Sequence, residues 1–368
     1  EWLEATVEKY PDKPAFSDTE SSITFRQVYD IARNTGAYLI EQLGVDRTPV
    51  AVFAGRKMVT PAYFLGVVYA GRPYAPIDAS LPDKRIEKIL ENLCPRAIVA
   101  DRESLEHVES IVDELEKSEG FDRPQIFIAE DISRFEPVEC ADSNCKISES
   151  AGDAVTDSEN DTDGGVVAGC AGKTDDSSRD MLAVVRRQMS MTDPLYIIYT
   201  SGSTGNPKGV MTSHLSLMTY INAYCDVMHI EESDVLGNQS PLDYIAAIRD
   251  IYLPLKTGCS TAIIPKEYFM EPNVLFDYMN EKNISSVGWS VSAFTILTSL
   301  GAFEEVGLKS LRKICFSGSV MPCRVLRKWQ ENLTEAHFVN QYGPTEATAS
   351  CTYYSVDHTV EDDEVLPI

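Results

Sequence analysis

The chain reads Tyr199-Thr-Ser-Gly-Ser-Thr-Gly-Asn-Pro-Lys-Gly-Val210 directly after the apolar run at residues 195–199, which has the pattern of a buried strand. Glycines at positions 202, 205 and 209 permit positive φ angles and a close approach of a ligand to the main chain. Hydroxyl groups and the Lys208 ammonium supply hydrogen-bond donors and one positive charge, which suits a polyphosphate. The stretch is not a Walker A loop, because Lys208 is followed by glycine and not by serine or threonine. The sequence therefore predicts a phosphate-binding loop between a strand and a helix.

Strand-like and helix-like segments alternate through most of the chain. Apolar residues recur at helical spacing in two long segments, and a short apolar run that indicates a buried strand follows each of them. This alternation predicts an α/β fold with layers of helices and largely parallel sheets. The predicted strands are residues 97–100, 125–129, 195–199, 262–265, 313–316 and 337–340, and the predicted helices are residues 82–93, 105–115, 213–228 and 272–281.

The composition excludes several classes of protein. The 368 residues carry a formal net charge of −25, which repels the phosphates of a nucleic acid. No stretch is long and apolar enough to span a bilayer, and the first residues do not have the pattern of a signal peptide. Nine cysteines without CxxC spacing favour reduced thiols over a disulfide framework or a zinc site. We therefore expect a cytoplasmic protein that has neither nucleic acid nor a membrane as its partner.

One acidic stretch interrupts the alternation of strands and helices. Residues 141–180 are rich in Asp, Glu, Gly and Ser, and they contain too few apolar side chains to offset the entropy of ordering. We predict a flexible acidic insert at about residues 136–190, within a first α/β subdomain at residues 1–190. A second α/β subdomain, which contains the phosphate loop, is predicted at residues 191–368.

The phosphate loop resembles the signature of the adenylate-forming superfamily, which includes acyl-CoA ligases, luciferases and the adenylation domains of nonribosomal peptide synthetases. Four more stretches resemble motifs of the amino-acid-activating branch in the same order. They are residues 11–16, residues 23–28, Tyr69-Ala-Gly-Arg-Pro-Tyr-Ala-Pro-Ile-Asp78 with Pro82 and Arg85 downstream, and Asn340-Gln-Tyr-Gly-Pro-Thr-Glu346. The resemblance implies the layered αβαβα large lobe of these enzymes. Because the sequence ends before the small C-terminal swivelling domain of the family, we expect that domain to be absent and adenylation to be impaired.

The resemblance also implies a reaction and its cofactors. Family members condense a carboxylic acid with ATP and Mg²⁺ to an acyl-adenylate and pyrophosphate, and then pass the acyl group to a thiol, here the phosphopantetheine of a carrier protein. Thr345 would contact the α-phosphate, Glu346 would help to hold Mg²⁺, and Tyr342 would stack on adenine. The implied nucleotide-binding residues are Thr200, Ser201, Gly202, Ser203, Thr204, Gly205, Lys208, Gly318, Asn340, Tyr342, Gly343 and Thr345; Thr200, Lys208, Thr345 and Glu346 would be catalytic.

The predicted acid pocket departs from the family pattern. A gapless count from Asp250 and Gly258 places Ile245 where the family has an Asp that holds the α-ammonium group of the substrate. A register two residues away restores the match through Asp243, but helical periodicity over residues 244–255 favours the gapless register. The pocket residues implied by it are Tyr244, Ile245, Ala246, Arg249, Trp289, Cys315, Ser317, Gln341, Ala349 and Ser350.

Arg249 is the unusual member of this pocket, because a buried guanidinium needs an anion as its partner. One interpretation is a substrate that lacks the free α-ammonium group or carries a second carboxylate for Arg249. The other is that Arg249 reaches solvent or pairs with a protein carboxylate such as Asp243 or Asp250.

The function that the sequence favours is an adenylation domain that activates an amino acid or a related carboxylic acid. A stand-alone D-alanine–carrier protein ligase and an acyl-CoA ligase are the alternatives among enzymes. A catalytically silent domain that binds nucleotide or carrier protein is the alternative from another class.

Overall fold

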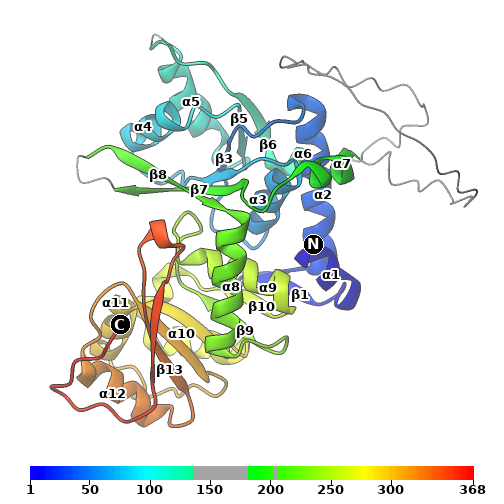
Figure 1. Ribbon diagram of the computed structural model, residues 1–368. Helices are drawn as coiled ribbons and strands as arrows, with labels where there is room; N and C mark the ends of the chain where they lie inside the picture. Colours follow the sequence, from blue (N-terminus) through cyan, green and yellow to red (C-terminus); the bar gives the residue numbers. More distant parts are fainter. Residues whose placement is uncertain (119, 136–180, 202–204) are drawn as a thin grey trace, which may run out of the picture.

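The computed structural model describes residues 1–118, 120–135, 181–201 and 205–368. The strands of these residues form two sheets, with helices between the sheets and on both outer sides (Figure 1). The predicted layered αβαβα architecture is therefore confirmed.

The first sheet contains six strands of the described chain, in the order β6-β5-β3-β4-β7-β8. It is parallel except for the antiparallel hairpin of β7 and β8. Helices cover both of its faces, and its central strands are accordingly apolar on both sides. The strands are β3 (Val50–Phe53), β4 (Tyr74–Pro76), β5 (Ala97–Ala100), β6 (Gln125–Ile128), β7 (Pro194–Ser201) and β8 (Pro207–Ser213).

The second sheet contains eight strands of the described chain, in the order β14-β13-β12-β11-β9-β10-β1-β2. Its central strands are parallel, and the antiparallel pairs β13–β14 and β1–β2 form its two ends. The strands are β1 (Pro14–Ser17), β2 (Ser22–Thr24), β9 (Val235–Asn238), β10 (Ser260–Ile263), β11 (Ser286–Ser290), β12 (Lys313–Ser317), β13 (His337–Tyr342) and β14 (Thr352–Val356).

Three layers of helices bury the faces of the sheets. Helices α4 and α5 cover the outer face of the first sheet, α10 to α12 cover the outer face of the second, and α2, α3, α8 and α9 pack between the two sheets (Figure 1). The helices are α1 (Trp2–Lys9), α2 (Phe25–Leu43), α3 (Thr60–Tyr69), α4 (Asp83–Leu93), α5 (Leu105–Leu115), α6 (Ala129–Ile132), α7 (Met181–Gln188), α8 (His214–Met228), α9 (Ala247–Thr257), α10 (Pro272–Glu281), α11 (Val291–Ser299) and α12 (Cys323–Asn332), with 3₁₀ turns η2 (Lys266–Met270) and η3 (Thr345–Ala347).

The predicted strands and helices are confirmed, with their ends shifted by at most a few residues. The end of the predicted acidic insert differs, because residues 181–188 form helix α7. Leu182 and Val185 lie one turn apart on α7 and are buried against α2 and α3, so this part of the stretch has an apolar face to bury. The rest of the predicted insert, residues 136–180, lies outside the described residues.

The two sheets exchange strands across the predicted boundary at residues 190 and 191. Strands β1 and β2 join the second sheet, where Phe16 pairs with Thr261, and β7 joins the first sheet, where Tyr196 pairs with Tyr74. That boundary therefore does not separate one sheet from the other.

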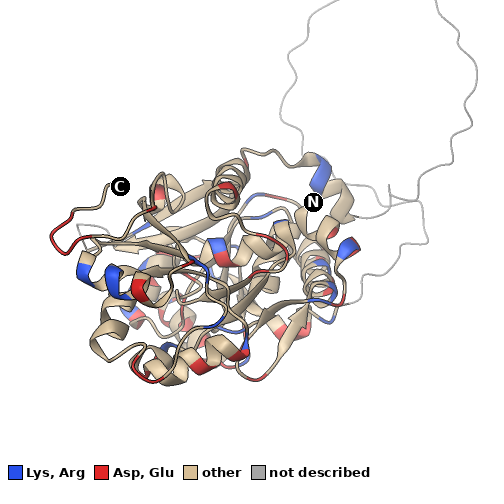
Figure 2. Cartoon of the chain, turned by 90° about the horizontal axis from the view of Figure 1, so that it is seen from below, with Lys and Arg blue, Asp and Glu red and all other residues tan. Residues whose placement is uncertain are grey.

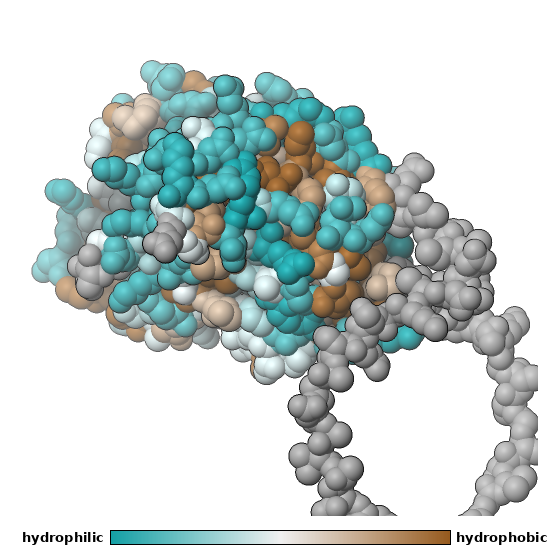
Figure 3. Space-filling view, turned by 90° about the horizontal axis from the view of Figure 1, so that it is seen from above, coloured by the Kyte–Doolittle hydropathy of each residue, from teal (hydrophilic) through white to brown (hydrophobic). Residues whose placement is uncertain are grey.

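The surface of the molecule mixes both signs of charge. In the cartoon seen from below, segments with Lys or Arg and segments with Asp or Glu are intermixed along the chain (Figure 2). On the face seen from above, hydrophobic atoms gather in patches that hydrophilic side chains separate, as is usual for folded proteins (Figure 3). Within the described part of the chain, no helix has the length and apolar character needed to cross a bilayer.

Candidate functional site

The predicted phosphate loop joins the two strands of the β7–β8 hairpin. Thr200 pairs with Lys208 and Ser201 with Pro207, so these side chains lie at the tip of the hairpin. Gly205 has a φ of +78°, which confirms that glycine is needed there for its backbone conformation. The remaining predicted loop residues, Gly202, Ser203 and Thr204, lie outside the described residues.

Gly209 serves a different purpose from the one predicted. Its φ is not positive, and it lies opposite Tyr199 in the hairpin. A Cβ at this position would lie 2.8 Å from Ile197 Cγ2 and 3.1 Å from Tyr199 Cζ. The glycine therefore makes room for the tyrosine ring to cross β8.

The turn η3 brings two more predicted residues to the hairpin. Its residues lie beside β8, with Cα atoms within 8 Å, so Thr345 and Glu346 approach the strand that carries Lys208. Thr345 is buried, whereas Glu346 is exposed and makes no hydrogen bond or ion pair with the described residues. A hydroxyl and an exposed carboxylate on η3 thus lie next to the strand that carries the Lys208 ammonium, and groups of these types bind a magnesium polyphosphate.

The donor set fits Mg²⁺ only together with a phosphate ligand. Among the residues that the structure describes, no three His, Cys, Asp or Glu side chains converge in a way that could hold a metal ion. One carboxylate, that of Glu346, can complete the shell of an ion that is otherwise held by phosphate oxygens and water.

The carboxyl ends of β12 and β13 border the same region. Gly318 follows β12 with a φ of +94°, and a Cβ there would meet no atom within 4 Å, so the main chain is open to a ligand. Tyr342 is 51% exposed, which leaves its ring available for stacking. Gly343 allows a close backbone contact, because a Cβ would lie 2.5 Å from the Ser350 Cα. The Asn340 amide instead donates to the Pro367 carbonyl at 2.7 Å, so its predicted contact with adenine stays a prediction.

The structure corrects the position of Trp289 in the predicted acid pocket. Gly288 pairs with Cys315 and faces the helices between the sheets, whereas Trp289 points to the opposite face. There its ring packs against Phe269 and Phe294, and its Nε1 donates to the Gly237 carbonyl at 2.8 Å. Successive residues of a strand face opposite sides, so a shift of one residue moves the side chain out of the pocket.

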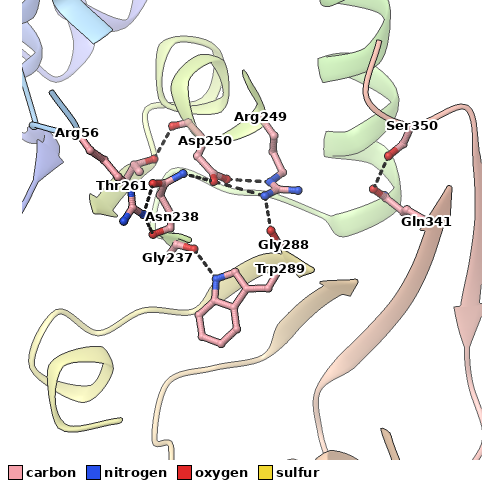
Figure 4. A network of polar contacts seen from close by, with 10 residues as sticks. All are labelled: Arg56, Gly237, Asn238, Arg249, Asp250, Thr261, Gly288, Trp289, Gln341 and Ser350. Atoms are coloured by element: carbon pink, nitrogen blue, oxygen red, sulfur yellow. Dashed lines mark hydrogen bonds and ion pairs between the residues drawn. The ribbon is translucent and has the colours of Figure 1, made fainter. Parts of the chain in front are cut away.

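Arg249 has a protein carboxylate as its partner. Its Nε donates to Asp250 Oδ1 at 2.8 Å and its terminal nitrogen to the Gly288 carbonyl at 2.5 Å (Figure 4). The guanidinium also lies over the Tyr224 ring, 5.6 Å from its centre. Burial lowers the pKa of Arg249, but the Asp250 carboxylate more than offsets this, and the guanidinium stays charged. Of the interpretations that the sequence left open, pairing with Asp250 is the one observed.

The Arg249–Asp250 pair belongs to a longer chain of contacts. Asn238 Nδ2 donates to Asp250 Oδ2 at 2.9 Å, and its Oδ1 accepts from Arg56 at 2.7 Å (Figure 4). Thr261 Oγ1 donates to the main-chain carbonyl of Asp250 at 2.7 Å. Sequence reasoning missed Asn238 and Arg56, because residues from separate segments meet only in the folded chain.

The other predicted pocket residues are partly brought together. Ser350 Oγ donates to Gln341 Oε1 at 3.2 Å (Figure 4). Burial raises the pKa of Cys315 to about 11, so its thiol stays protonated beside Arg249. Ile245 is 5% exposed and belongs to the apolar core, whereas Tyr244 is 55% exposed. Partly buried positions are held by Ala246, Ser317 and Ala349.

Asp243, the residue of the other register, lines a cavity of about 570 Å³ between the two sheets. The cavity lies at the carboxyl ends of β3, β4, β9 and β10, where open α/β sheets commonly bind ligands. Burial, and then the neighbouring Asp78 carboxylate, raise the pKa of Asp243. Arg56 lines the same cavity. The chain of hydrogen bonds that runs from Arg249 through Asp250 and Asn238 to Arg56 therefore reaches this cavity.

Comparison with known proteins gives the same architecture. A family model described as AMP-binding enzyme matches residues 3–367. A solved nonribosomal peptide synthetase, FmoA3, superimposes with a TM-score of 0.75 at 18% identity, over 100% of this chain and 33% of that one. The Vibrio cholerae adenylation domain AlmE, solved with glycyl-adenosine-5′-phosphate, gives 0.74 at 21% identity, over 98% of this chain and 62% of that one.

Curated relatives are named D-alanine–D-alanyl carrier protein ligase. The protein from Bacillus licheniformis is 27% identical over 369 residues, which cover 99% of this chain and 62% of the relative. The protein from Bacillus cereus strain Q1 is 28% identical over 370 residues, which cover 100% of this chain and 63% of the relative. The chain thus spans about three fifths of the length of these relatives.

Proposed function

Because this chain belongs to the AMP-binding enzyme family, we propose that it is the nucleotide- and acid-binding part of an ATP-dependent acid–thiol ligase. The reaction joins a small carboxylic acid to the AMP part of ATP with release of pyrophosphate, and then transfers the acyl group to the phosphopantetheine thiol of a carrier protein with release of AMP. The names of the curated relatives, which are carrier protein ligases, support the carrier protein as acceptor. Both the adenylation domain of a synthetase and a stand-alone carrier protein ligase fit this description.

The observation that carries the proposal is the contact between η3 and β8. It brings the turn that contains Thr345 and Glu346 next to the strand that bears Lys208, and the tip of that hairpin carries the hydroxyl groups of Thr200 and Ser201. The carboxylate of the acid must attack the α-phosphorus of ATP, so two anions have to be held side by side. Hydroxyl donors, the Lys208 ammonium and a magnesium ion at Glu346 would offset this negative charge.

The acid that we propose lacks a free α-ammonium group. Ile245 offers no charge at the position where the family has an Asp, and it is packed into the core. The Arg249 guanidinium is already paired with Asp250 and the Gly288 carbonyl, so it neither requires nor repels a second charged group on the acid. Hydroxy and aryl acids fit a pocket at Ile245 and Arg249 better than α-amino acids, because Ile245 supplies no anion for an ammonium group and the Asp250 carboxylate is already paired with Arg249. The register through Asp243, which lines the cavity between the sheets, would instead favour an α-amino acid.

Thermal unfolding with ligands tests the nucleotide and the acid separately. A ligand at 100 times its Kd raises the stability of the folded state by about 2.7 kcal/mol without any turnover. We expect a shift with AMP, and larger shifts with acyl-sulfamoyl adenylates that carry hydroxy or aryl acyl groups. A largest shift with an α-amino acyl group would overturn the proposed acid, and no shift with any ligand would overturn the nucleotide site.

A pair of lysine variants supplies the control. Lys208→Met removes one charge-assisted contact to a phosphate and should weaken ATP binding about 10- to 100-fold, while AMP binding stays the same. Lys84→Met removes an exposed lysine from the first turn of α4 and should change neither. Equal effects of the two variants would contradict the assignment of the hairpin as the triphosphate site.

A further inference from the structure

Helix α4 forms hydrogen bonds to the β7–β8 hairpin at two places, one on β7 and one next to the start of β8. Lys88 and Asn92 lie one turn apart on α4, so their side chains share one face of the helix. Lys88 Nζ donates to Asn206 Oδ1 at 3.0 Å, next to the start of β8, and Tyr199 on β7 donates its hydroxyl to Asn92 Oδ1 at 2.8 Å. The two contacts thus hold the hairpin on either side of its tip.

The hydrogen bond from Tyr199 to Asn92 depends on Gly209, which lies opposite Tyr199 on β8. Tyr199 starts on β7, and its ring crosses over Gly209 of β8 before its hydroxyl reaches α4. Burial raises the pKa of Tyr199 to about 12, so the hydroxyl keeps its proton and remains a donor at neutral pH.

The hairpin needs such support because β8 is an edge strand. Among the strands that the structure describes, it ends the first sheet and pairs only with β7. Helix α4 is firmly fixed, since Ile86, Ile89 and Leu90 are fully or almost fully buried against the outer face of the sheet. Contacts from a fixed helix therefore set where the tip of a less constrained hairpin lies.

We propose that Lys88, Asn92 and Tyr199 are positioning residues that hold the β7–β8 hairpin ready for the β- and γ-phosphates of ATP. This inference rests on the proposed function, which places these phosphates at Thr200, Ser201 and Lys208. Lys88 acts through its hydrogen bond to Asn206, not through its charge. A prearranged hairpin binds the triphosphate without first losing the freedom of a loose strand end.

Nucleotide titrations of matched variants test the proposal. We expect Asn92→Leu, Tyr199→Phe and Lys88→Met each to weaken the binding of Mg-ATP about five- to tenfold, as the loss of one hydrogen bond implies. AMP binding should stay within about twofold, because AMP has no β- or γ-phosphate. Lys88→Gln, which keeps a donor without the charge, should bind Mg-ATP like the unchanged protein. The control Glu91→Gln alters an exposed side chain on the same helix and should have no effect.

Three outcomes would overturn the proposal. One is an equal loss of ATP and AMP binding, which would indicate general damage to the site. Another is a Lys88→Gln variant as weak as Lys88→Met, which would make Lys88 a phosphate-binding charge. The third is a double variant, Asn92→Leu with Tyr199→Phe, whose effect equals the sum of the single effects, because partners in one hydrogen bond cannot be lost twice.

Hydrogen exchange separates this proposal from the proposed function. In Asn92→Leu the backbone amides of β8 should exchange faster, while those of β3 in the middle of the sheet keep their protection. If the unchanged chain binds neither ATP nor AMP, the proposed function fails, and the exchange rates alone decide whether α4 holds the hairpin. Unchanged exchange in β8 would refute the role of α4 in either case.

Discussion

At the scale of single residues, Arg249 and Gly288 depend on each other. A Cβ on Gly288 would lie 2.3 Å from the Arg249 guanidinium carbon, so the charged group occupies the space that any side chain would need. The Gly288 carbonyl in turn accepts a hydrogen bond from Arg249, and Asp250 supplies the charge partner. A glycine inside a strand here marks a close approach by another group, which is a signal that sequence analysis can use.

We predict that Gly288→Ala destabilises the protein by about 1–3 kcal/mol, because the new methyl group must displace a buried and fully paired guanidinium. Gly307→Ala is the matched control, since a Cβ there would meet no atom within 4 Å and the backbone has no positive φ. That change should stay within about 0.5 kcal/mol. Urea unfolding of both variants measures the difference, and equal stabilities would show that Arg249 moves aside at little cost.

The sequence could indicate which residues matter near Arg249 but not which way they point. Spacing from Asp250 identified Arg249 and named Asp250 among its partners, because a buried guanidinium requires an anion. The motif spacing predicts that Trp289 lines the pocket, but the residue that faces Arg249 is the preceding one, Gly288. The register of β11 against β12 decides this, and that register depends on contacts between segments that spacing along one chain does not contain.

At the scale of elements, helix α2 begins with a reciprocal cap. The Thr24 hydroxyl accepts from the Gln27 main-chain N–H at 3.2 Å, and the Gln27 side chain accepts from the Thr24 N–H at 2.9 Å. These residues lie within the stretch 23–28 that resembles a family motif. The motif therefore has a local structural reason, since it stops β2 and starts a 19-residue helix.

We predict that Thr24→Ala lowers the free energy of unfolding by about 1 kcal/mol, as the loss of a helix cap usually does. Thr24→Ser should restore most of this stability because it keeps the hydroxyl acceptor. The control is Thr19→Ala, at an exposed position just before β2. Thermal unfolding monitored by circular dichroism provides the measurement, and a Thr24→Ala variant as stable as Thr19→Ala would contradict the role of the cap.

Elements with a strong local pattern could be predicted, and short pairing strands could not. The apolar run that forms β5 and the helical stripe of α4 are confirmed, because buried parallel strands and amphipathic helices each leave a period in the sequence. Strand β2 has only three residues, lies at the edge of the second sheet and pairs with another short strand, β1. Such a segment is too short to show a period.

At the scale of the whole molecule, the exchange of strands ties the two sheets together. The second sheet takes β1 and β2 from the first residues of the chain, and the first sheet takes β7 and β8 from beyond residue 190. Apolar side chains from both sheets and from the helices between them form one continuous core. A cut between residues 190 and 191 would therefore remove strands from both sheets.

We predict that residues 191–368, produced alone, do not fold into a stable unit. This piece lacks β1 and β2, which cover the edge of β10, and it leaves the β7–β8 hairpin without its sheet. Urea titration followed by tryptophan fluorescence should show no cooperative transition for the piece and a clear one for residues 1–368. A cooperative transition in the piece would support the predicted subdomain boundary despite the exchange.

The pairing of β1 with β10 also sets an order of events during synthesis of the chain. Phe16 and its partner Thr261 are separated by 245 residues. At about 5–20 residues per second, a ribosome needs roughly 12–50 s to make the intervening chain. During that time β1 and β2 have no sheet to join, because β10 has not yet been made. The unpaired edges of the two strands are exposed to other proteins in the cell. Both strands are short, and the charged residues Asp12, Lys13, Asp18 and Glu20 flank them, which discourages pairing with the edges of other nascent chains.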